Sequence, residues 1–138
     1  MRFSGQVQQR QGEHSLQVGR GCHLVANDSE APWIFLSHSF QPNTRIHQQP
    51  EGDAVKVAGM VDLTCVTITD VPVGAPISFD YTLHEWDMEN PFVCHESGRE
   101  VRGFMHLTEE EQDAALKQAQ KHIKILHMQW LFGQSSRC

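Results

Sequence analysis

Short stretches of alternating apolar and polar residues run through the first half of the chain, and this pattern predicts β-strands. Residues 14–18 and 22–26 have the pattern of a hairpin joined by the turn-forming Gly19-Arg20-Gly21. Residues 1–13 contain few apolar side chains, and we expect a frayed lead-in segment there. Residues 33–36 form a dense apolar run that we expect to be buried.

The middle of the chain continues in the same way. Strands are predicted at residues 44–48 and 54–59, on either side of a Pro-Glu-Gly-Asp turn, and along residues 61–71. After a further Pro-Val-Gly turn, Ile77 and Phe79 face one way in another short strand. These elements predict a mainly β domain.

The last predicted element is an amphipathic helix over residues 108–133. Thr108 and Glu111 have the spacing of a capping box, which places the start of the helix at Thr108. Acidic residues follow at its beginning and lysines come later, an order that complements the helix dipole. Its apolar face is predicted to contain Leu116, Ala119, Ile123, Leu126 and Trp130. The fold class is therefore mainly β with a C-terminal α-helix.

Composition narrows the functional classes. The chain has 138 residues, a length that suggests one domain. Its net charge of −6 disfavours direct nucleic-acid binding but is compatible with a basic peptide as partner. No apolar run approaches the roughly 20 residues that span a bilayer, and the polar start does not resemble a signal peptide. We therefore expect an intracellular protein, cytoplasmic or nuclear, without membrane contact.

Two stretches carry recognisable motifs. Residues 35–44 read Phe-Leu-Ser-His-Ser-Phe-Gln-Pro-Asn-Thr, and residues 67–81 run from a hydrophobic strand through Asp-Val and Gly to Phe-Asp-Tyr. They resemble two signatures of the SET-domain family of protein-lysine methyltransferases, Phe-x-Asn-His-Ser-Cys-x-Pro-Asn and the strand ending in Phe-Asp-Tyr. The resemblance assigns residues 14–91 to the C-terminal half of a SET-like core, shortened at its N-terminus.

What the resemblance implies is a SET-like β-fold of short hairpins with a pseudoknot-like loop crossing. It further implies S-adenosylmethionine as cofactor and a lysine-bearing protein or peptide as substrate. Tyr81 matches the catalytic tyrosine, and its phenol is expected beside the backbone of Ser37 and His38. Those two residues match cofactor contacts, and Phe79 matches the wall of the substrate channel.

Residues 92–107 resemble a degenerate post-SET segment. In the family this segment closes over the cofactor, which gives Phe92 and Cys94 a cofactor-binding role by resemblance. Only Cys94 remains of three cysteines, and zinc usually takes four thiolate or imidazole ligands, so we expect no metal here.

A catalytically inactive, SET-derived protein-interaction module is the alternative interpretation. The replacement of the motif asparagine by Ser37, the short N-terminal part and the lost cysteines favour this alternative. Retention of Tyr81 in Phe-Asp-Tyr favours the methyltransferase. Neither interpretation fixes the substrate protein or the oligomeric state.

Overall fold

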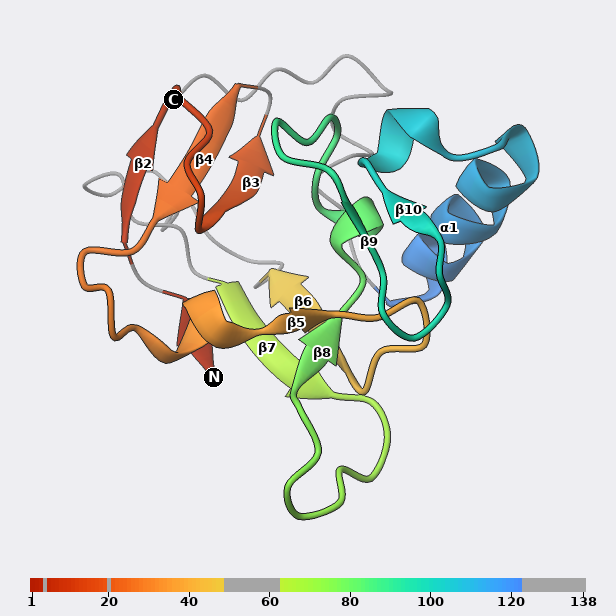
Figure 1. The fold of residues 1–138 in the computed structure, drawn as a ribbon, viewed down its shortest axis with the longest axis horizontal. Coiled ribbons are helices and arrows are strands. Elements are labelled where there is room, and N and C mark those ends of the chain that lie inside the picture. Colours follow the sequence, from red (N-terminus) through yellow and green to blue (C-terminus); the bar gives the residue numbers. More distant parts are fainter. Residues whose placement is uncertain (4, 20, 49–62, 123–138) are drawn as a thin grey trace.

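The computed structural model describes residues 1–3, 5–19, 21–48 and 63–122. In this part of the chain, small sheets and short 3-10 turns make up the body, and one helix lies near the C-terminal end (Figure 1). The prediction of a mainly β fold with a C-terminal helix is therefore confirmed. No helix in the described ranges is long and apolar enough to cross a membrane.

The predicted hairpin at residues 14–26 is present. Strands β3 (Ser15–Gly19) and β4 (Cys22–Val25) pair antiparallel, and β2 (Gln6–Gln8) adds to the other edge of β4. Gly21 follows β3 with a φ of 66°, a left-handed conformation that glycine adopts without a Cβ clash.

The expectation of a frayed lead-in over residues 1–13 is wrong. Strand β1 (Arg2–Phe3) pairs with β7 (Leu63–Thr67), and the buried Phe3 ring packs 5.5 Å from the ring of Trp33, centroid to centroid. One buried aromatic side chain and a few ladder hydrogen bonds anchor this segment. The mean hydropathy of these thirteen mostly polar residues does not reveal such an anchor.

A second three-stranded sheet has the order β1-β7-β6, in which β6 spans Thr44–Gln48. The strand predicted for residues 61–71 is shorter than expected, because β7 ends at Thr67 and its partner strand β6 begins opposite that residue. The predicted strand at 54–59 lies outside the described residues. Beyond Thr67 the chain forms a projecting loop (Figure 1), in which Val73 is fully exposed.

The apolar run at 33–36 is only partly buried. It forms a 3-10 turn, η1 (Pro32–Phe35), in which successive side chains point in three directions. Trp33 and Leu36 therefore enter the core, whereas the Phe35 side chain is 71% exposed. The core also includes buried side chains from every sheet of the N-terminal half, namely Phe3, Leu16, Val18, Cys22, Leu24, Ile46, Leu63 and Phe79.

The C-terminal part continues through η3 (Tyr81–Leu83), the antiparallel pair β9 (Phe92–Val93) and β10 (Glu100–Val101), η4 (Phe104–His106) and α1 (Glu109–His122). The predicted capping box is confirmed. The Thr108 N–H donates to the Glu111 carboxylate at 2.9 Å, and the Glu111 N–H donates to the Thr108 hydroxyl at 3.2 Å. Residues 123–133 of the predicted helix lie outside the described residues.

Candidate functional site

The two motif segments lie side by side. Strand β5 (Ser37–His38) pairs in parallel with β8 (Ser78–Phe79), two strands that are about forty residues apart along the chain (Figure 1). The ladder extends at both ends, where the Ser37 N–H donates to the Ile77 carbonyl at 3.0 Å and the Ser39 N–H to the Phe79 carbonyl at 3.1 Å. We call this contact between residues 36–44 and 76–81 the crossing.

Side chains of the first segment reinforce the crossing. Asn43 accepts from the Ser78 N–H at 2.9 Å and donates its amide to the Pro76 carbonyl at 2.8 Å. The buried Thr44 hydroxyl donates to the Ser78 carbonyl at 2.7 Å. An amide side chain supplies both a donor and an acceptor, so Asn43 substitutes for a further strand residue at this point.

Tyr81 connects the crossing to the rest of the site. Its phenol donates to the Leu36 carbonyl, and its backbone N–H donates to Nδ1 of His38 at 3.1 Å. The phenol contacts the first motif segment, but its partner is the Leu36 carbonyl and not the expected backbone of Ser37 or His38. Burial and the negative charge of Glu85 raise the pKa of Tyr81, so the phenol stays protonated at neutral pH.

His38 is held as a neutral imidazole. Because Nδ1 accepts from Tyr81, the ring proton must be on Nε2, an atom that is buried and has no hydrogen-bond partner among the described residues. The side chain is 1% exposed and packs edge-on against Phe40 and Phe92, at centroid distances of 4.4 and 5.8 Å. Burial lowers the pKa of His38 to about 4.

The other candidate cofactor residues are spread around this cluster. Ser37 is exposed, and the ring of Phe92 is 37% exposed and lies 5.9 Å from that of Tyr81. Cys94 is buried, and hydrogen bonds from the side chain and backbone of Ser97 lower its pKa. No three His, Cys, Asp or Glu side chains of the described ranges are grouped to hold a metal ion.

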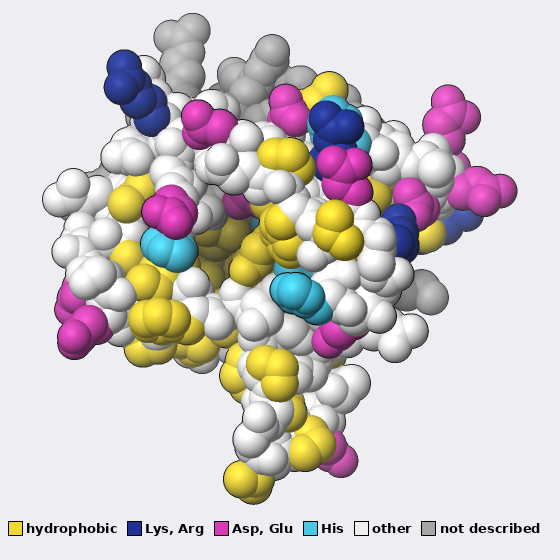
Figure 2. Space-filling view, viewed as in Figure 1, with side chains coloured by type: hydrophobic (Ala, Val, Ile, Leu, Met, Phe, Trp, Pro, Cys, Tyr) yellow, Lys and Arg dark blue, Asp and Glu magenta, His cyan; other side chains and the backbone are white. Residues whose placement is uncertain are grey.

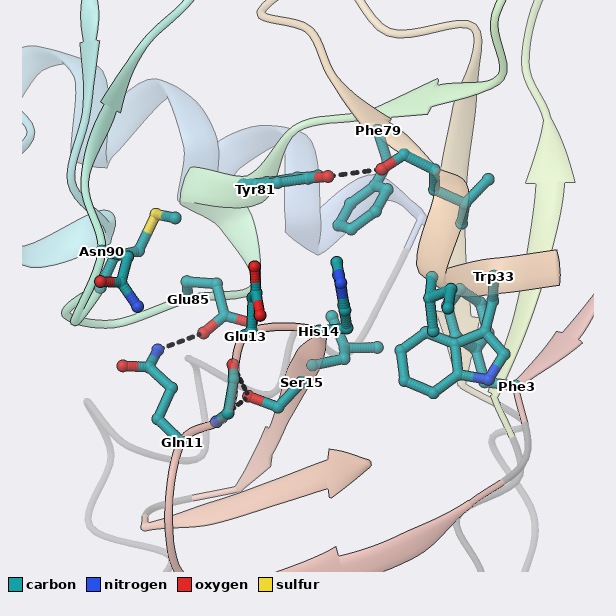
Figure 3. Close-up of a pocket in the computed structure, with 15 residues that line it drawn as sticks. Phe3, Gln11, Glu13, His14, Ser15, Trp33, Phe79, Tyr81, Glu85 and Asn90 are labelled. Atoms are coloured by element: carbon teal, nitrogen blue, oxygen red, sulfur yellow. Dashed lines mark hydrogen bonds between the residues drawn. The ribbon is translucent and has the colours of Figure 1, made fainter. Parts of the chain in front are cut away.

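A cavity of about 110 Å³ opens beside Tyr81. Figure 3 shows Tyr81 and Phe79 along one side, Trp33 and Phe3 at one end, and Glu85 with Gln11 at the other. On the molecular surface in Figure 2, hydrophobic side chains line a hollow that has acidic and histidine side chains at its rim. The lining residues are Phe3, Gln11, Gly12, Glu13, His14, Ser15, Leu16, Trp33, Ile34, Leu36, Phe79, Tyr81, Glu85, Met88 and Asn90.

The cavity separates the residues predicted from the sequence into two groups. Tyr81 and Phe79, the expected catalytic and channel residues, both line it. The four expected cofactor contacts are not part of its lining, namely Ser37, His38, Phe92 and Cys94. Tyr81 belongs to both neighbourhoods, since its ring also contacts those of His38 and Phe92.

Glu85 is the most deeply buried acidic residue of the cavity, and it is among the lining residues that sequence reasoning missed. Its side chain is 6% exposed and accepts from the Gln17 N–H at 2.9 Å and the Gln11 amide at 3.2 Å. Burial raises the pKa of Glu85 to about 7, although these two hydrogen bonds lower it in part. Glu85 stands four residues after Tyr81, and its N–H donates to the Tyr81 carbonyl at 2.8 Å.

A neighbouring segment fixes the backbone at Glu85. The Phe104 N–H donates to the Glu85 carbonyl at 2.8 Å, and the Phe104 ring stacks on Trp86 at 5.7 Å. Gly103 makes this contact possible, because a Cβ there would lie 2.5 Å from the Trp86 carbonyl oxygen and the φ of 117° suits only glycine. The segment of residues 92–107 thus supports the cavity through backbone packing.

The site combines a protonated phenol, a largely apolar cavity and one buried carboxyl group. Such a combination suits a ligand with an apolar stem and a polar or cationic end.

Comparison of the chain with protein-family models, curated proteins and solved structures gave no match.

Proposed function

We propose that this chain is a SET-like protein-lysine N-methyltransferase that uses S-adenosylmethionine, with Tyr81 as its catalytic residue. One observation carries the proposal: Tyr81 is bonded to the first motif segment at Leu36 and His38 and also lines the cavity with Phe79. The two motifs that resemble the family are therefore in contact, and the residue expected to act on the substrate borders a space that a side chain can enter.

The role of Tyr81 is to orient the substrate amine. Its hydroxyl hydrogen is directed to the Leu36 carbonyl, which leaves the oxygen lone pairs to accept an N–H from an amine in the cavity. An amine held in this way keeps its own lone pair for attack, which is catalysis by positioning. A free lysine amine has a pKa of about 10.4, and desolvation beside Phe79 and Trp33 favours the neutral form that reacts.

The residues predicted to contact the cofactor offer it suitable partners. S-adenosylmethionine supplies, when bound, a methyl group on a cationic sulfur. The Nε2–H of His38 is a buried donor without a partner among the described residues, and such an orphaned group suits an acceptor on a ligand. The exposed Ser37 hydroxyl and the partly exposed Phe92 ring add a polar and an aromatic contact. Cys94 is buried and would contribute through packing.

Calorimetric titration of the purified chain with S-adenosylmethionine tests the cofactor. Saturable heat at micromolar concentration is the expected result. A folded protein that releases no binding heat at millimolar cofactor contradicts the methyltransferase.

Tyr81→Phe tests the catalytic residue, because it removes only the hydroxyl and keeps the ring packed against Phe79. We expect transfer of labelled methyl groups to lysine-bearing proteins to fall by at least about 100-fold, the usual scale for losing a positioned catalytic group. Thr69→Ala is the matched control, since it removes an exposed hydroxyl in the projecting loop. Full activity of Tyr81→Phe would rule out the proposed role.

A catalytically inactive protein-interaction module is the second candidate. The observation that favours it is that none of the four cofactor candidates lines the cavity. On this alternative the cavity binds a partner's side chain without transferring a methyl group. Absence of cofactor binding together with retained binding of a lysine-bearing partner supports the module over the enzyme.

A further inference from the structure

We propose that the cavity beside Tyr81 binds a primary alkylammonium group, with the carboxylate of Glu85 as its anchor and the aromatic rings of the cavity around its stem. The inference deepens the proposed function and rests on it for the source of the group, a lysine side chain that enters in its charged form and must lose its proton before methyl transfer. Binding itself requires no cofactor and is measured without one.

Glu85 has unused capacity to accept hydrogen bonds. One carboxylate oxygen accepts from the Gln17 N–H and the other from the Gln11 amide, so each oxygen has one bond where two can be accepted. The three donors of an ammonium group fit this remaining capacity. Both existing bonds also hold the carboxylate in place before a ligand arrives, which reduces the entropic cost of binding.

The rest of the lining favours a cation with an apolar stem. The rings of Phe79, Tyr81 and Trp33 border the cavity, and aromatic faces attract cations and cover methylene groups. Glu13, also in the lining, adds a second carboxylate, so anionic ligands are disfavoured. The volume of about 110 Å³ holds several water-sized groups, enough for the end of a lysine side chain.

A metal ion is a poorer fit than an ammonium group. Calcium requires six to eight oxygen ligands, and the lining provides two carboxylates. Within the described part of the chain no cluster of three metal-ligating side chains is found. An arginine side chain ends in a larger, planar guanidinium group, which suits a space of about 110 Å³ less well than the compact ammonium of lysine does.

The charge of Glu85 gives the binding a defined pH dependence. Since burial raises its pKa to about 7, the carboxylate is mostly neutral at pH 6 and mostly ionised at pH 8. The other titratable groups that line the cavity are Glu13, His14 and Tyr81. Tyr81 keeps its proton over this range, because its pKa is raised. Affinity for an ammonium ion should therefore rise about tenfold from pH 6 to pH 8 as Glu85 ionises.

The test is an NMR titration of the full chain with n-butylamine, which is an ammonium ion below pH 10, and with n-butanol, its neutral analogue. We expect saturable shifts at the cavity residues with n-butylamine at pH 8, about tenfold weaker binding at pH 6, and weaker binding of n-butanol at both pH values. Equal affinity for the two probes, or an affinity for n-butylamine that does not change with pH, overturns the proposal.

Glu85→Gln is the decisive variant, because the amide keeps an acceptor for Gln17 but cannot ionise. We expect it to bind n-butylamine at least tenfold more weakly at pH 8 and to lose the pH dependence. Glu89→Gln is the matched control, since it makes the same charge change on an exposed neighbour outside the lining, and its affinity should stay within twofold. If Glu85→Gln fails to fold, the comparison of the two probes on the unchanged chain still decides.

The outcomes separate this inference from the proposed function. Cofactor binding without any preference for n-butylamine over n-butanol removes the ammonium site and leaves the methyltransferase. Selective binding of n-butylamine without cofactor binding keeps the ammonium site and supports the protein-interaction module. A peptide with one lysine, compared with the same peptide with norleucine in its place, then shows whether the cavity accepts the group from a protein.

Discussion

The crossing and the cavity each hold a buried titratable group, a base in the first and an acid in the second, whose neutral form is favoured by burial. In the crossing, His38 has its pKa lowered to about 4, and in the cavity Glu85 has its pKa raised to about 7, both mainly by burial. Below its ordinary pKa of 6.5, His38 takes up a proton more readily in the unfolded chain, so the crossing loses stability as pH falls from 6.5 to 4. Glu85 loses its proton more readily in the unfolded chain, so the cavity loses stability as pH rises from 4.5 to 7.

The two regions are also built differently. The crossing consists of a parallel ladder and of side chains that bond to backbone, as Asn43 and Thr44 do. The cavity end around Glu85 consists of contacts between polar residues from separate parts of the chain, Gln11 and Gln17 among them. Contacts of the first kind require particular residues within each motif segment. Contacts of the second kind depend on how distant segments pack.

The largest loss of stability is expected from Gly103→Ala, which disrupts the close backbone contact beside Glu85. The new Cβ would meet the Trp86 carbonyl at 2.5 Å in a backbone conformation that alanine avoids, so we expect a loss of about 4 kcal/mol in the free energy of unfolding. Gly74→Ala is the control, because its φ is also positive but nothing lies within 4 Å of the added atom. It should cost about 1 kcal/mol. Equal losses for the two variants, measured by urea denaturation, would show that the contact with Trp86 is unimportant.

The second-largest loss of stability is expected from Asn43→Ala, which removes side-chain bonds that hold the crossing together. It removes the side-chain bonds to the backbone groups of Ser78 and Pro76, together with a longer one from the Ser78 hydroxyl, so we expect a loss of about 3 kcal/mol. Asn43→Asp keeps the acceptor for the Ser78 N–H and loses only the donor, which should give a smaller loss. Asn27→Ala, at an exposed position, serves as the control. If both Asn43 variants unfold like the original chain, the side chain does not hold the crossing.

Sequence reasoning was effective where a contact depends on residues close together in the chain. The hairpin of residues 14–26 and the capping box of Thr108 and Glu111 are examples, and both are confirmed. The contact of Tyr81 with the first motif segment was also expected, from a resemblance that specifies which residues meet.

The remainder depended on tertiary packing. Phe3 stands in a polar segment, and its burial follows only from the meeting of β1 with β7 and Trp33. Glu85 follows no periodic pattern, because its hydrogen-bond partners Gln11 and Gln17 are about seventy residues earlier. A buried carboxyl group of this kind is recognised only when the surrounding elements are in place.

Glu85→Gln sharpens the contrast in pH response. The rise in the pKa of Glu85 from its ordinary 4.5 to about 7 corresponds to about 3 kcal/mol at roughly 1.36 kcal/mol per pKa unit. Since the amide carries no charge, we expect the variant to be about 2–3 kcal/mol more stable than the original chain at pH 8 and equally stable near pH 4.5. Thermal unfolding across this range checks the prediction. A difference that does not depend on pH would mean that ionisation of Glu85 has no influence on folding.

The smallest effect is expected from Ser39→Ala, which separates the crossing from the loop at residues 94–99. The buried Ser39 hydroxyl donates to the Glu96 carboxylate at 2.7 Å and accepts from the Gln41 N–H at 3.0 Å. Its removal should cost about 1–2 kcal/mol, because a bond to a charged acceptor is lost. A double-mutant cycle with Glu96→Ala isolates the contribution of this pair. A coupling energy near zero would mean that the loop is held by other contacts, such as the Arg99 guanidinium over the Phe40 ring at 4.2 Å. A coupling of about 1 kcal/mol would show that the segment of residues 92–107 stabilises the crossing through Ser39 as well as the cavity through Gly103.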